Sequence, residues 1–75
     1  VKRGFDDDEI IITVKNIWFT IPKQIRLQHA QNLWEVWAKI NSPQSLDRSR
    51  IKIVDVNANE VGGSGFFGSK ISVND

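Results

Sequence analysis

Apolar side chains recur at helical spacing over residues 25–40. Placed at about 100° per residue, they cover an arc of roughly 220°, whereas a helix packed on one side needs a stripe of about 100°. The apolar positions are Ile25, Leu27, Ala30, Leu33, Trp34, Val36, Trp37, Ala38 and Ile40. The pattern predicts a helix over residues 22–40 whose centre packs on the protein's own sheet and whose surplus apolar surface meets a second partner.

Either margin of this arc is a candidate for that contact. Leu27, Trp34 and Ala38 lie at one margin, and Ile25 and Val36 lie at the other. Large aromatic side chains such as Trp34 are typical anchors of binding interfaces. The hypothesis therefore assigns Leu27, Trp34 and Ala38 as the protein-interface residues.

Strand patterns flank the predicted helix. Residues 10–21 are rich in β-branched and aromatic side chains, and the apolar parity changes at Lys15 and Asn16, where a bulge or a tight turn is expected. Residues 51–56, a glycine-rich stretch and residues 71–73 read as further strands. The order predicts an α+β fold in which a single helix packs on one face of a small, three- to four-stranded, mainly antiparallel sheet, in β-α-β-β order.

Composition narrows the class of protein. The 75 residues predict one domain over residues 1–75, in which residues 1–9 form a flexible acidic arm. No cysteine is present, which excludes disulfides and thiolate metal sites. The net charge of +1 attracts neither nucleic acid nor anionic membranes as a whole. No apolar run approaches the roughly 20 residues that span a bilayer, so we expect a cytoplasmic protein without a membrane partner.

Glycine spacing gives one apparent nucleotide motif. Residues 63–68 fit the pattern G-x-G-x-x-G, but no helix is expected after them and no acidic residue follows at the required distance. The glycines are instead interpreted as allowing close backbone packing in a bent strand. No cofactor is expected, although an anion-binding hairpin at residues 63–68 stays open.

Basic residues give an alternative function. Arg48, Arg50 and Lys52 alternate along a predicted strand, Lys70 is a further candidate beside them, and Phe66 and Phe67 offer rings for stacking on bases. A basic sheet face with aromatic side chains is typical of single-stranded nucleic-acid binding. The alternative reading is a solvated strand whose charges deter edge-to-edge pairing.

Other candidate chemistry is sparse. Asp6 and Asp8 have oxygen ligands for a hard cation, but the calcium-loop spacing is missing, so no metal site is expected. His29 is the only histidine and lies at the border of the apolar arc, without an acidic residue on its face. No serine has an evident general base, and we therefore expect no catalytic residues and no enzyme activity.

The spacing Ile21-Pro22-x-x-Ile25-Arg26-x-x-His29-Ala30-x-x-Leu33-Trp34-x-x-Trp37, followed by the glycine-rich residues 61–69, resembles small cyanobacterial proteins of uncharacterised function. The resemblance implies a bacterial cytoplasmic protein and assigns no functional residues.

Taken together, these patterns predict a non-catalytic protein-interaction or self-associating module. Its partner is another protein or a second copy of the chain, which would form a homodimer. Single-stranded nucleic-acid binding through the basic sheet face is the alternative.

Overall fold

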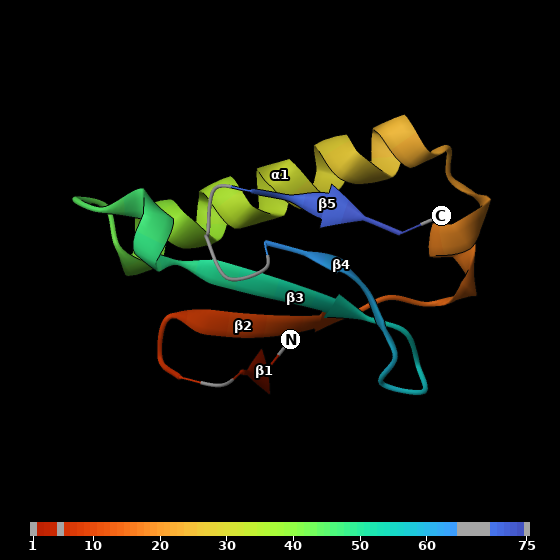
Figure 1. Cartoon of the computed structure of the whole chain (residues 1–75), viewed down its shortest axis with the longest axis horizontal. Helices are drawn as coiled ribbons and strands as arrows, with labels where there is room; N and C mark the ends of the chain where they lie inside the picture. The colour runs from red at the N-terminus through yellow and green to blue at the C-terminus, as the bar shows by residue number, and fades with distance from the viewer. Residues whose placement is uncertain (1, 5, 65–69, 75) are drawn as a thin grey trace.

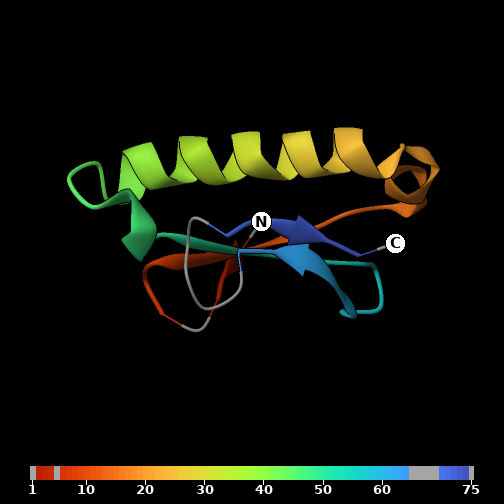
Figure 2. The same ribbon diagram turned by 45° about the horizontal axis from the view of Figure 1, so that its top comes forward.

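The computed structural model describes residues 2–4, 6–64 and 70–74. Within them, one α-helix covers one face of a five-stranded sheet (Figures 1 and 2). The elements are strand β1 (Lys2–Arg3), strand β2 (Glu9–Thr13), 3-10 helix η1 (Asn16–Thr20), helix α1 (Lys23–Asn41), 3-10 helix η2 (Leu46–Arg48), strand β3 (Arg50–Val54), strand β4 (Glu60–Gly63) and strand β5 (Ser72–Val73). The predicted α+β class with a single helix on one face is confirmed.

The strands follow chain order across the sheet, from β1 at one edge to β5 at the other. β2 and β3 are parallel, and the long connection that parallel neighbours require is supplied by α1. The other three pairs are antiparallel. The predicted count of three to four strands and the order β-α-β-β are wrong, because the described residues form five strands in the order β-β-α-β-β-β.

The additional strand lies in the segment expected to be a flexible acidic arm. β1 pairs with β2 in antiparallel register, and Gly4 N–H donates to the carbonyl of Glu9 at 2.9 Å. Between them the carboxylate of Asp6 accepts the backbone N–H of Asp8 at 2.9 Å and forms an ion pair with Arg50. These two interactions hold the pKa of Asp6 below its ordinary value of 3.8. The acidic residues thus stabilise a turn between β1 and β2.

The predicted strand over residues 10–21 ends early. β2 stops at Thr13, and the chain forms η1 just after the predicted change of face at Lys15. η1 turns Trp18 inward, where it is only 7% exposed, while Ile17 and Phe19 remain on the surface. The 3-10 turn that replaces the strand here thus places one large ring in the core without extending the sheet.

The core lies between α1 and the sheet. Its buried members are Trp18, Ala30, Ile51, Ile53, Val61 and Val73. Ala30 is fully buried at the centre of α1, where a small side chain lets the helix approach the sheet closely. The helix begins after Pro22, as expected from proline at a helix start.

Hydrogen bonds fix both ends of α1. At its start the buried guanidinium of Arg26 donates to the carbonyls of Ile21 and Asn74, at 2.9 and 2.8 Å. At its end the side-chain amide of Asn41 donates to Asp8 Oδ1 and to Ser49 Oγ, both at 2.9 Å. The hydrogen bonds of Asn41 join the end of the helix to the residues that directly precede β2 and β3.

Candidate protein-interaction surface

One side of α1 carries exposed apolar side chains. Ile25 is 47% exposed, Leu33 42%, Val36 60% and Ile40 73%, and His29 is exposed among them. We call these five residues the α1 flank. At about 100° per residue they cover an arc of about 80° beside the part of the helix that packs on the sheet. The surplus apolar surface expected from the sequence therefore exists, on the margin that holds Ile25 and Val36.

The residues of the predicted interface, Leu27, Trp34 and Ala38, do not form an exposed margin of α1. Ala38 is fully buried, and Leu27 and Trp34 pack against the core. The indole Nε1–H of Trp34 donates to the carbonyl of Ser49 at 2.7 Å, which holds the ring over the start of β3. The helical periodicity makes the two margins of the apolar arc equivalent. The hydrogen bond between Trp34 and Ser49, which lies beyond the helix, holds the margin with Trp34 on the sheet.

A shallow hollow lies in the middle of the α1 flank. It has a volume of about 320 Å³ and is lined by Trp18, His29, Asn32, Leu33 and Val36. Trp18 comes from η1, and the other four residues come from two successive turns of α1. Among the described residues, the indole Nε1 of Trp18 is the buried side-chain nitrogen or oxygen without a hydrogen-bond partner. The hollow thus brings the Trp18 side chain of η1 next to three residues of the α1 flank, His29, Leu33 and Val36.

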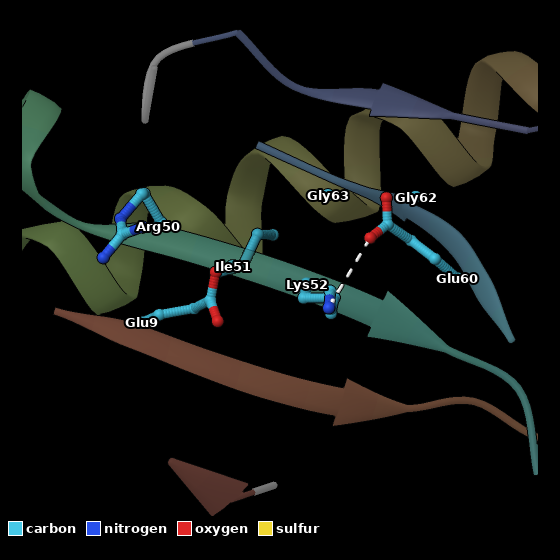
Figure 3. Close-up of a pocket in the computed structure, with 7 residues that line it drawn as sticks. All are labelled: Glu9, Arg50, Ile51, Lys52, Glu60, Gly62 and Gly63. Carbon is cyan, nitrogen blue, oxygen red and sulfur yellow. Dashed lines mark ion pairs between the residues drawn. The ribbon is translucent and has the colours of Figure 1, made fainter. Parts of the chain in front are cut away.

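The sheet face turned away from α1 carries two of the predicted basic residues, Arg50 and Lys52 (Figure 3). A second hollow of about 200 Å³ lies there, lined by Glu9, Arg50, Ile51, Lys52, Glu60, Gly62 and Gly63. Lys52 Nζ is 3.8 Å from Glu60, Arg50 pairs with Asp6, and exposed Arg48 is 3.7 Å from Asp8. Each of these cations therefore faces a carboxylate, and the face carries charges of both signs.

The remaining candidates for nucleic-acid binding are not gathered at this hollow. Lys70 is exposed and does not line it. Phe66 and Phe67 lie outside the described residues. The described part of the structure thus brings together Arg50 and Lys52, with their acidic partners, from the set of six predicted residues.

The backbone conformation at Gly63, the first glycine of the G-x-G-x-x-G pattern, explains why glycine occurs there. Gly63 has a φ of +142°, and a Cβ at this position would lie 2.6 Å from the carbonyl oxygen of Ile51. Only glycine fits this backbone and this close approach between β4 and β3. The rest of the motif, residues 65–68, lies outside the described residues.

The described ranges contain neither a group of metal-ligating side chains nor a membrane-spanning helix. No group of three or more metal-ligating side chains occurs there. No helix in this part of the chain has the length and apolar character needed to cross a membrane. Asp6 and Asp8, considered above as cation ligands, contact Arg50 and Asn41 respectively.

From the sequence alone, the α1 flank was one of two possible margins of the helical apolar arc, and the other margin was selected. Ile25 and Val36 mark the α1 flank in the helical pattern, but neither is aromatic, and the choice of Trp34 as an anchor pointed to the other margin. Comparisons with protein-family models, with curated proteins and with solved structures found no match for this chain.

Proposed function

We propose that this protein is a non-catalytic, cytoplasmic protein-interaction module that binds through the α1 flank. The observation that carries the proposal is the stripe of exposed apolar side chains on one side of a long, well-anchored helix. Single apolar residues on a surface are ordinary, whereas contiguous apolar patches mark interfaces.

The energetics favour such a role. Full burial of a Val, Leu or Ile side chain contributes about 1.5–3 kcal/mol, and the four apolar flank residues are 42–73% exposed. A partner that covers the stripe therefore gains several kcal/mol. α1 is held at both ends by Arg26 and Asn41, so little conformational entropy is lost when the partner binds.

Nucleic-acid binding receives less support. Arg48, Arg50 and Lys52 already have carboxylates beside them, and a phosphate would have to compete with these ion pairs. We therefore do not extend the proposal to the sheet face.

Site-specific photo-crosslinking tests the proposal. A photoreactive benzoylphenylalanine replaces Val36 on the flank, and in a matched control it replaces Gln31, which is exposed on the polar side of the same helix. After irradiation of the source cells, we expect adducts of higher mass from position 36 that position 31 does not form. Equal labelling at both positions, or none at either, would contradict the proposal.

A further inference from the structure

We propose that the occupant of the α1 flank is a second copy of this chain, whose α1 packs antiparallel to the first across a two-fold axis. This inference rests on the proposed function and names its partner. A two-fold interface is self-complementary, because each residue i that contacts j is matched by j contacting i. For two antiparallel helices, contact positions that are symmetric about a common centre satisfy this condition.

The spacing of the flank has this symmetry. Its outer members are Ile25 and Ile40, the next pair inward is His29 and Val36, and the centre falls between Asn32 and Leu33. Reversing the helix about that centre exchanges the members of each pair. An antiparallel copy in this register places Ile25 opposite Ile40 at both ends, so that two exposed apolar side chains meet at each end.

The hollow lies at the same centre. Its four helical residues, His29, Asn32, Leu33 and Val36, follow the spacing i, i+3, i+4 and i+7 that forms a hole for one side chain of a facing helix. The symmetry operation exchanges these four residues among themselves. Leu33 of the second copy lies at the level of this hole, over the floor that Trp18 provides.

Charge also favours a second copy. A two-fold axis brings the residues nearest to it close to their own counterparts, so a charged residue at the centre of the contact would repel itself. The flank contains no Asp, Glu, Lys or Arg, and the two residues nearest the axis, Leu33 of the flank and the adjacent Asn32, carry no charge. The nearest ion pair, Lys39 with Glu35 at 2.8 Å, lies on the polar side of the helix and is already satisfied. A flank without a carboxylate, lysine or arginine offers little selective attraction to an oppositely charged protein.

The size of the flank determines the strength of the dimer. From Ile25 to Ile40 it extends about 22 Å along a helix about 10 Å wide. Such a patch is smaller than the roughly 800 Å² per partner of a standard interface and belongs to the weak, transient class. We therefore expect a dimer that forms reversibly as concentration rises.

Disulfide trapping tests the register, because the sequence contains no cysteine of its own. Ile25→Cys and Ile40→Cys chains are mixed in a glutathione redox buffer, and the products are separated by mass. Antiparallel pairing brings residue 25 of one copy to residue 40 of the other, but leaves the two residues 25 about 22 Å apart, too far for a disulfide. We expect the mixed 25–40 disulfide to exceed either homodisulfide about ten-fold or more, a ratio that corresponds to about 1.4 kcal/mol.

A Gln31→Cys chain is the matched control, because its thiol lies on the polar face and should give only the proportions of random collision. The antiparallel register would be overturned if the Ile25→Cys and Ile40→Cys chains formed mixed disulfides and homodisulfides in the proportions of random collision. It would also be overturned if homodisulfides predominated. Far-UV circular dichroism checks that all variants fold, as expected for substitutions at exposed positions.

Sedimentation velocity tests the dimer independently. The wild-type chain should rise from 8.6 kDa towards twice that mass with concentration. Val36→Glu should abolish this rise, whereas Gln31→Glu, with the same charge change on the polar face, should retain it. A chain that stays monomeric at every concentration overturns the second-copy proposal. In that case, photo-crosslinked adducts between position 36 and a different protein would still support the proposed function. The absence of such adducts would reject both the proposed function and the second-copy proposal.

Discussion

Ala58 holds a backbone conformation that its side chain disfavours. Its φ is +66°, the only positive value at a non-glycine residue within the described ranges. It closes the turn between β3 and β4, where Ala58 N–H donates to Asp55 and Asp55 N–H donates to Asn59. These hydrogen bonds hold the residue in the left-handed region at a cost of about 1 kcal/mol.

Replacing Ala58 with glycine should stabilise the protein. Glycine adopts this φ without a steric penalty, and the gain exceeds the entropy that glycine adds to the unfolded chain, leaving up to about 0.5 kcal/mol. Urea unfolding followed by tryptophan fluorescence measures the change. Asn57→Gly, one residue earlier and without a positive φ, should lower the free energy of unfolding. A loss of stability in Ala58→Gly would show that the turn is not strained.

At the scale of elements, α1 was the most predictable part of the chain. The pattern placed it at residues 22–40, and it spans Lys23–Asn41, because a long helical repeat bounded by two prolines leaves few alternatives. η1 was predicted as strand because Ile17, Phe19 and Ile21 alternate as strand residues do. The inward position of Trp18 depends on packing with α1, which a local pattern does not contain. β1 was missed because two residues carry no periodicity.

The polar cluster at the end of α1 is expected to stabilise the junction of helix and sheet. Asn41→Ala removes two hydrogen bonds and leaves Asp8 Oδ1 and Ser49 Oγ without this donor, which should cost about 1–3 kcal/mol. Urea unfolding measures the loss. Gln44→Ala, at an exposed position just beyond the helix, should change the free energy of unfolding by less than about 0.5 kcal/mol. An equal effect of both substitutions would exclude a specific role for the cluster.

At the scale of the whole molecule, the candidate surface followed only partly from the sequence. An apolar arc too wide for one contact was predictable, because it depends on spacing alone. Which margin of the arc stays exposed was not predictable, because Trp34 donates to the carbonyl of Ser49, which lies in a segment beyond the helix. The pairing of Arg50 with Asp6 was equally hidden, because the two residues meet only through the folding of β1 and β2 beside β3.

The acidic side chains predict how stability depends on pH. Backbone N–H donors of Asn59 and Asn57 lower the pKa of Asp55 from its ordinary 3.8, and the Asp8 N–H and Arg50 lower that of Asp6. A carboxyl whose pKa is lower in the folded state stabilises the protein above its unfolded pKa. That stabilisation is lost as pH falls through the folded value. The free energy of unfolding should therefore decrease below about pH 4.

Asp55→Asn tests this dependence, because it removes the titrating group and retains an oxygen acceptor. Urea unfolding between pH 6 and pH 2.5 should show a shallower acid slope for this variant than for the wild-type chain. Asp6→Asn should reduce the slope as well. A slope identical to that of the wild type in both variants would assign the acid sensitivity to other groups.

The parallel pairing of β2 with β3 has a consequence for synthesis on the ribosome. β2 leaves the exit tunnel long before β3, and its register partners, Arg50–Val54, are translated only after the whole of α1. At about 5–20 residues per second, β2 waits roughly 2–8 seconds for its central neighbour. During that interval Ile10, Ile11 and Ile12 are available to chaperones, so the nascent chain is most vulnerable to aggregation before its second half has been made.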